Sequence, residues 1–126
     1  MRFENRRLKI AEYEVDGTLR EKECDKNAPI SHLTTIPPDN KVYRVSRVIE
    51  KIEKQKDKFW SYVYENGKII EKTKIAVEPI HDKQKGDYVR THRDGVEENN
   101  LLELPIYYKE NKYYKKCKLK LKIGIT

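Results

Sequence analysis

The stretch DNKVYRVSRVIEKIEKQ, residues 39–55, decides the fold because its apolar side chains recur at helical spacing. Steps of three and four residues relate these side chains, which are Val42, Val45, Val48, Ile49 and Ile52. Asp39 or Asn40 can cap the helix, since short polar side chains accept hydrogen bonds from its first backbone N–H groups. The stretch predicts a helix from about Lys41 to Gln55 that packs its apolar stripe on a sheet. The charged residues expected to face water are Arg44, Arg47, Glu50, Lys51, Glu53 and Lys54.

The segment after this helix predicts a strand pair. Residues 59–64, FWSYVY, are aromatic or β-branched at most positions, which is typical of a strand. Asn66-Gly67 favours a type I′ turn, so a second strand is expected to return through residues 69–77. Pro79 either ends that strand or lies at a sheet edge, because proline cannot donate a hydrogen bond to a neighbouring strand.

A first hairpin is expected near the N-terminus, where residues 8–15 and 18–23 flank the turn signal Asp16-Gly17. Residues 25–40 hold three prolines, so we expect a loop there. The whole pattern predicts an α+β fold, with a mostly antiparallel sheet and one main helix packed on one face.

Size and composition favour one domain over residues 1–126, with a thin, tyrosine-rich core, because 39% of the residues are charged and 37% hydrophobic. No apolar run of about 18 residues occurs, so no membrane span is expected. The first residues lack the apolar stretch of a secretion signal, which makes a cytoplasmic location the expectation. In that reducing compartment Cys24 and Cys117 are expected to be free thiols.

Most of the formal charge of +7 lies near the C-terminus, since residues 106–126 carry seven lysines against Glu110. Apolar residues alternate with lysines after residue 115, which predicts a strand with one lysine face. Such lysines contact phosphates, and nearby tyrosines, among them Tyr107 and Tyr108, stack on unpaired bases. The residues expected to bind nucleic acid are Lys116, Lys118, Lys120, Lys122, Tyr113 and Tyr114. The same lysine pattern is also typical of an edge strand protected against aggregation.

A second candidate site lies at residues 88–91, YVRT, a predicted strand that follows a polar loop at residues 81–87. Alternation places Tyr88 and Arg90 on one face of this strand and the two residues between and after them on the other. The planar guanidinium of arginine holds an anion or a carboxylate through two parallel hydrogen bonds. The polar residues expected to form an anion-binding patch are Tyr88, Arg90, His32 and Asn99. Alternatively, Arg90 pairs with a carboxylate such as Asp94, and the Asp and Asn residues here simply form turns.

Motifs for nucleophilic catalysis or phosphate-binding loops do not occur in the sequence, so we expect neither an enzyme nor a cofactor. A metal site would require the three histidines, His32, His81 and His92, to converge with Asp82, Asp94 or a cysteine, and their spacing matches no known ligand pattern. A hydrolase with His32 or His92 as its base is the least supported alternative.

Five short motifs occur in order between residues 30 and 105: ISHL, YVRT, DG, NLL and LP. In this order they resemble the small bacterial family known as domain of unknown function 3892. The resemblance covers residues 30–105 and leaves the N-terminal hairpin and the lysine-rich residues 106–126 outside. It implies an accessory module of bacterial or phage origin rather than a metabolic enzyme, and it carries no activity.

The leading hypothesis is a non-enzymatic binding module whose basic, tyrosine-rich C-terminal strand engages a polyanion, most simply nucleic acid, or else an acidic protein surface. The alternative is a protein-interaction or inhibitory module of a phage or mobile element. Such a module would bind a host protein or sequester a small anionic ligand near Arg90. Membrane lipid is not an expected partner.

Overall fold

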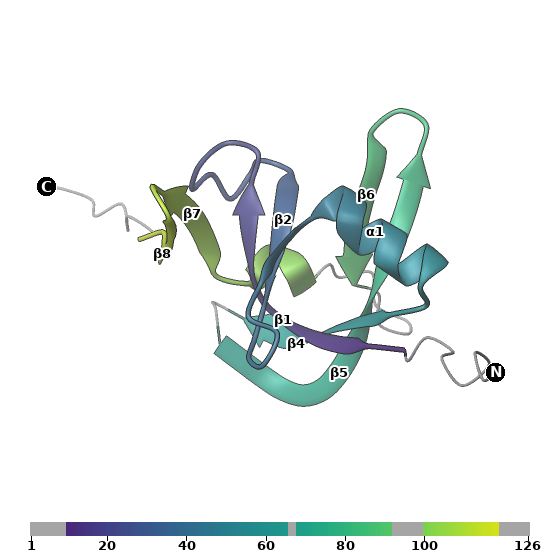
Figure 1. Ribbon diagram of the computed structural model, residues 1–126. Coiled ribbons are helices and arrows are strands. Elements are labelled where there is room, and N and C mark those ends of the chain that lie inside the picture. Colours follow the sequence, from purple (N-terminus) through teal and green to yellow (C-terminus); the bar gives the residue numbers. More distant parts are fainter. Residues whose placement is uncertain (1–9, 66–67, 92–99, 119–126) are drawn as a thin grey trace, which may run out of the picture.

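The computed structural model describes residues 10–65, 68–91 and 100–118 (Figure 1). The elements within these ranges, in chain order, are β1 (Glu12–Arg20), β2 (Ile30–Thr35), β3 (Val42–Arg44), α1 (Val45–Lys54), β4 (Lys58–Glu65), β5 (Lys68–Asp82), β6 (Gly86–Thr91), the 3-10 helix η2 (Asn100–Glu103), β7 (Ile106–Glu110) and β8 (Tyr113–Lys116). The predicted α+β class, with a mostly antiparallel sheet and one main helix, is confirmed.

The strand order is β3-β2-β1-β4-β5-β6, and β7 joins at β1 and carries β8 (Figure 1). Strand β1 changes its neighbour along its length. Residues 12–14 run parallel to β4, whereas Thr18 and Leu19 run parallel to β7. A register shift between Val15 and Gly17 marks a bulge at this change of partner. The predicted hairpin with a turn at residues 16–17 is therefore wrong, because these residues lie inside one bulged strand.

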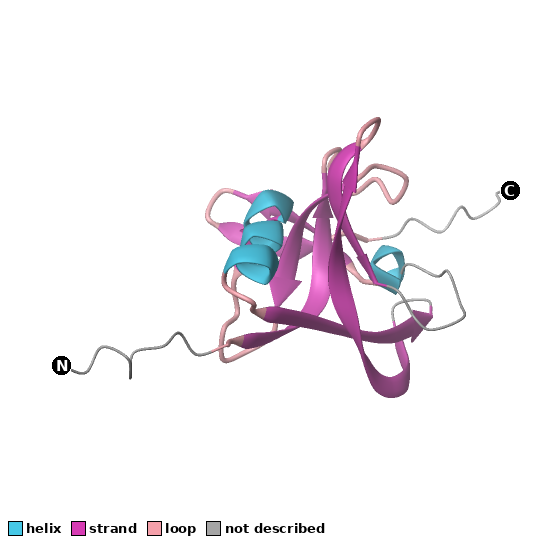
Figure 2. Cartoon of the chain, turned by 90° about the vertical axis from the view of Figure 1, so that its right-hand side faces the viewer, coloured by secondary structure: helices cyan, strands magenta, loops and turns pink. Residues whose placement is uncertain are grey.

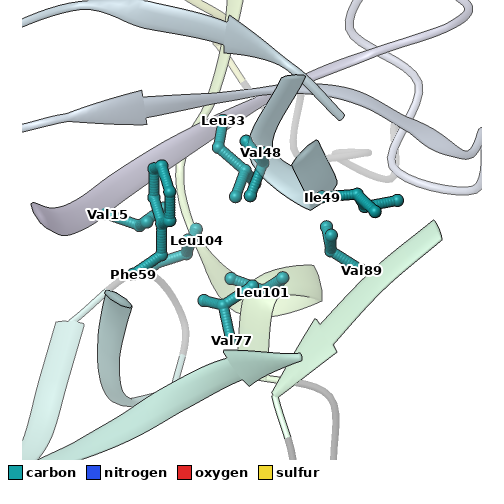
Figure 3. Close-up of a cluster of buried hydrophobic side chains, with 9 residues drawn as sticks. All are labelled: Val15, Leu33, Val48, Ile49, Phe59, Val77, Val89, Leu101 and Leu104. Atoms are coloured by element: carbon teal, nitrogen blue, oxygen red, sulfur yellow. The ribbon is translucent and has the colours of Figure 1, made fainter. Parts of the chain in front are cut away.

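Helix α1 packs against both ends of a strongly bent sheet. It packs against β2 and β3 at one end of the strand order and against β6 at the other. This packing is possible because the sheet bends strongly, most visibly where β5 curves at the bottom of Figure 1. Figure 2 shows α1 lying along one side of the bent strands. The core lies between the helix and the sheet, and its buried members are Val15, Leu33, Val48, Ile49, Phe59, Val77, Val89, Leu101 and Leu104 (Figure 3).

The predicted helix is real, but it begins later than predicted. Val48 and Ile49 are buried, and Val45 and Ile52 pack against the core, so this part of the predicted stripe is confirmed. Residues 42–44 instead pair with β2 as β3. The expected cap is also wrong, because Asp39 accepts hydrogen bonds from the hydroxyls of Thr35 and Tyr43 rather than from the helix.

Lys51 does not face water as predicted, since its side chain is only 12% exposed. Its Nζ lies 5.3 Å from the ring centroid of Tyr13 and 5.5 Å from that of Tyr43. The same Nζ is 3.6 Å from Oδ2 of the buried Asp57. This cation–π and ion-pair cluster fixes the helix to β1, β3 and the start of β4.

Four further predictions meet the structure with mixed results. Residues 30–35, expected within a loop, form β2 and bury Leu33. Strands β4 and β5 pair as predicted, while their turn at residues 66–67 lies outside the described ranges. Pro79 lies inside β5 where that strand pairs with β6, beyond the β4 pairing, which fits the predicted sheet edge. The loop predicted for residues 81–87 is shorter, because its ends belong to β5 and β6.

Cys24 and Cys117 form a disulfide, so the prediction of two free thiols is wrong. The two residues are 93 positions apart, yet their Cα atoms are 5.6 Å apart because β7 and β8 return to the end of β1. No local sequence signal marks such a pair. Along the described residues, no helix combines the length and the apolar composition that a membrane crossing requires.

Replacement of Ile49 by alanine should lower the free energy of unfolding by about 2–4 kcal/mol, because a buried side chain is lost and a cavity remains. Ile49 is 6% exposed within the core. Urea unfolding of both proteins measures the change, and Lys54→Ala, at an exposed position of the same helix, is the matched control. A loss below about 1 kcal/mol would show that the helix stripe is not part of the core.

Candidate nucleic-acid interface

A groove with a volume of about 510 Å³ lies where β1, β2 and β3 meet the β7–β8 hairpin. We call it the tyrosine groove. Its lining residues are Asp16, Thr34, Thr35, Asn40, Lys41, Val42, Tyr107 and Tyr114. Figure 1 shows β7 and β8 beside the end of β1.

Tyr107 reaches the groove because Gly17 has no side chain. A Cβ atom at Gly17 would lie 2.7 Å from Thr34 Oγ1 and closer still to the Tyr107 ring. Any larger residue would displace that ring, so glycine is required here by close packing rather than by a turn. Burial, and then the nearby Asp16 carboxylate, raises the pKa of the half-buried Tyr107, which keeps its phenol neutral.

The β7–β8 hairpin presents two different faces. Tyr107 pairs with Lys116, and Lys109 pairs with Tyr114, so these four side chains share one face. Tyr114 lines the groove, and Lys109 Nζ lies 6.0 Å from the centroid of its ring. The groove-side face of the hairpin therefore combines two aromatic rings with two lysines.

The opposite face carries Tyr108, Glu110, Tyr113 and Lys115, since strand residues alternate. Lys115 forms an ion pair with Glu110, which offsets its charge on this face. Tyr113 is 70% exposed and Tyr114 is 42% exposed. Both tyrosines were predicted to bind nucleic acid, but the structure places them on different faces.

Part of the predicted lysine face lies within the described residues. Lys116 and Lys118 are exposed on either side of the buried Cys117, as the alternation predicts. Lys120 and Lys122 lie outside the described residues.

The disulfide and one backbone hydrogen bond hold the hairpin against β1. The disulfide joins Cys117 to Cys24 in the β1–β2 loop, and the backbone N–H of Thr18 donates to the carbonyl of Pro105, directly before β7, at 3.0 Å. Arg20 in turn fixes the loop, because its Nη1 donates to the carbonyls of Lys26 and Ala28 at 2.6 and 2.9 Å. The β7–β8 hairpin, which forms one wall of the tyrosine groove, is therefore joined through the disulfide to a loop that Arg20 holds in place.

Of the predicted anion-binding patch, the structure describes Tyr88, Arg90 and His32. Val89 and Thr91 are buried while Tyr88 and Arg90 are half-buried, so the predicted faces of β6 are confirmed. Arg90 lies opposite Glu78 in register, and its Nε donates to the carbonyl of the following residue at 3.3 Å. Asn99, like the alternative partner Asp94, lies outside the described residues.

His32 lies in β2 and lines a cavity together with Asp87 of β6. Its Nδ1 lies 2.8 Å from Ser31 Oγ, and burial together with the charge of Arg44 lowers its pKa. The cavity beside it, about 310 Å³, is also lined by Arg44 and Asp87. Among the described residues, no hydrogen bond joins His32 to Tyr88 or Arg90.

His81 links α1 to the β5–β6 hairpin. Its Nε2 lies 2.7 Å from Glu53 Oε2, and its Nδ1 lies 2.9 Å from Asp87 Oδ1. These two carboxylates raise its pKa. His92 lies outside the described ranges, within which no group of three or more His, Cys, Asp or Glu side chains is arranged to hold a metal ion.

These features define a small α+β domain with an aromatic groove, beside two hairpin lysines, at the junction of a bulged strand and a C-terminal hairpin. The chain belongs to the family described as protein of unknown function (DUF3892), whose model matches residues 23–105, so the predicted resemblance is confirmed. Neither the curated proteins nor the solved structures contain a match. The family match includes β2 and β3 of the groove and ends directly before β7, while Asp16 lies before it.

Sequence reasoning missed Gly17 beneath the Tyr107 ring and the groove residues outside the hairpin, which are Asp16, Thr34, Thr35, Asn40, Lys41 and Val42. A glycine inside an otherwise strand-like pattern is a known sign of close backbone approach, and this signal could have identified Gly17. Asp16 and Lys41 carry no such signal, because only the tertiary fold brings them to the hairpin.

Loss of the disulfide should lower the free energy of unfolding by about 3–5 kcal/mol, since it closes a long loop and restricts the unfolded chain. The Cys24→Ser/Cys117→Ser variant and the oxidised wild type are compared by urea unfolding. Wild type reduced with a dithiol is the control for the substitutions themselves and should match the variant. Equal stability of oxidised and reduced wild type would contradict this disulfide.

Because the folded pKa of His81 is raised, its protonated form stabilises the fold. This stabilisation is complete below the unfolded pKa, about 6.5, and is lost as pH rises through the folded value. His81→Gln should therefore lower the melting temperature more at pH 6 than at pH 9. A difference between wild type and variant that does not change between these pH values would contradict the proposed pairing with Glu53 and Asp87.

Proposed function

We propose that this domain is a non-enzymatic binding module that engages single-stranded nucleic acid through the tyrosine groove. The observation that carries the proposal is the gathering of Tyr107, Tyr114 and Lys41 around one cavity, with Lys109 and Lys116 on the same face of the hairpin. The volume of the groove lies within the range of about 300–1,000 Å³ that is usual for ligand sites.

The two kinds of side chain match the two parts of a nucleic-acid strand. Lysine side chains contact the phosphates without regard to sequence. Tyrosine rings stack on the faces of bases, and each such contact is worth about 1–3 kcal/mol. In a duplex those faces are covered by neighbouring bases, so Tyr107 and Tyr114 favour an unpaired strand.

The cellular location determines whether the disulfide is oxidised when the domain binds its ligand. The sequence predicts a cytoplasmic location, whereas the Cys24–Cys117 disulfide favours an oxidising compartment. We propose that the oxidised form is the one that binds, because the disulfide anchors the hairpin wall of the groove. Binding assays therefore require protein with the disulfide intact.

The alternative remains a protein-interaction or inhibitory module of a phage or mobile element. An acidic protein surface would also be attracted by Lys109, Lys116 and Lys118, yet it would leave the tyrosine groove without a base to stack. A small anionic ligand near Arg90 would be insensitive to substitutions in the groove. Substitutions at Tyr114 and at the hairpin lysines therefore separate these hypotheses.

Tyr114→Ala should weaken binding of a labelled oligothymidine of about ten nucleotides by roughly five- to 150-fold, through loss of one stacking platform. Tyr113→Ala is the matched control, because it removes a more exposed tyrosine from the opposite face of the same hairpin. Fluorescence anisotropy at low salt measures both affinities. Equal effects of the two substitutions would contradict binding in the groove, and no binding by wild type would overturn the proposed function.

The salt dependence should report the lysines that meet phosphates. Replacing Lys109 and Lys116 by glutamine should reduce the slope of log affinity against log salt by about 0.7 for each lysine. Lys115→Gln should leave the slope unchanged, since Lys115 lies on the other face and pairs with Glu110. A larger change of slope for Lys115→Gln would contradict this assignment, because the phosphates would then lie on the opposite face of the hairpin.

A further inference from the structure

We propose that Asp16 makes the tyrosine groove selective for guanine, an inference that rests on the proposed binding of single-stranded nucleic acid. Asp16 stands at the bulge of β1, between the paired residues Val15 and Gly17. Among the described residues that line the groove, it is the one carboxylate.

The carboxylate of Asp16 is oriented but not neutralised. Thr34 Oγ1 donates to Asp16 Oδ1 at 2.6 Å, and Thr34 also lines the groove. No lysine or arginine of the described residues forms an ion pair with Asp16. Thr34 is therefore a positioning residue for a charged acceptor that still has free lone pairs, because a carboxylate offers about four acceptor positions.

A carboxylate without an ion-pair partner among the described residues restricts what can lie beside it in the groove. It repels phosphate, so the strand's phosphates are expected to follow Lys109 and Lys116 on the hairpin. Asp16 and Tyr107 line the same groove, and the Asp16 carboxylate contributes to the raised pKa of the Tyr107 phenol. A base stacked on Tyr107 would then direct its hydrogen-bonding edge toward Asp16.

The bases differ in what they offer to a carboxylate at that edge. Guanine presents two adjacent donors, N1–H and the 2-amino group, which match the two carboxylate oxygens. Adenine and cytosine present one amino group beside an acceptor nitrogen, which would repel the second oxygen. Thymine and uracil present one N–H between two carbonyl groups. Guanine is therefore the base that Asp16 accepts best, through its Watson–Crick edge as in other single-strand readers.

The test uses oxidised wild-type protein and oligothymidines that differ at one central position, which is guanine, hypoxanthine, adenine, cytosine or thymine. Fluorescence anisotropy should show guanine bound about five- to 150-fold more tightly than adenine, cytosine or thymine, as for one good bidentate contact. Hypoxanthine lacks the 2-amino group and should fall between guanine and the others. This comparison requires no variant.

Asp16→Asn should abolish the preference for guanine, because an amide cannot accept two hydrogen bonds side by side. Asp87→Asn, at an exposed carboxylate outside the groove lining, is the matched control and should retain the preference. Binding of all five oligonucleotides with equal affinity would overturn guanine selectivity and leave the proposed function standing. Binding of none of them at low salt would overturn the proposed function itself.

Discussion

The packing of the Tyr107 ring on Gly17 is the contact on which the rest of this structure depends. Gly17 lies in β1 where that strand bulges and changes its neighbour from β4 to β7. The parallel pairing of β1 with β7 covers only two residue pairs, and the Tyr107 ring packs closely on Gly17 beside them. The disulfide holds the same end of the hairpin, because Cys117 directly follows Lys116, the residue that pairs with Tyr107. The absence of a side chain at Gly17 thus sets the position of the Tyr107 ring, which lines the groove.

This junction also explains why the groove combines residues that are far apart in the sequence. Asp16 comes from the bulge, Thr34 and Lys41 come from β2 and the loop after it, and Tyr114 comes from β8. The two faces of the hairpin then differ in chemistry, since Lys115 is neutralised by Glu110 on one face while Lys109 lies near Tyr114 on the other. The family match ends before β7. The groove residues of β2 and β3 therefore lie within the matched part of the chain, whereas those of β7 and β8 lie outside it.

Local signals in the sequence predicted local structure well. The apolar spacing of Val45, Val48, Ile49 and Ile52 identified α1, and alternation gave the correct faces of β6. The start of the helix was missed because Val42 fits a helical stripe as well as it fits β3, which is held by pairing with β2. The Asp16-Gly17 pair is a turn signal by composition, yet the positions of β4, β7 and Tyr107 make it a bulge. The disulfide joins residues 93 positions apart, and the groove brings β2 and β3 beside a hairpin far along the chain, which no local pattern encodes.

The affinity of Gly17→Ala for oligothymidine tests the central claim most directly. A Cβ atom at this position must displace the Tyr107 ring, because it would come within 2.7 Å of both Thr34 Oγ1 and the ring. The account predicts that the variant, still folded by circular dichroism, binds at least several-fold more weakly than wild type, since one stacking surface has moved. Wild-type affinity in the folded variant would contradict the account, because the groove would then not depend on the contact between Gly17 and Tyr107.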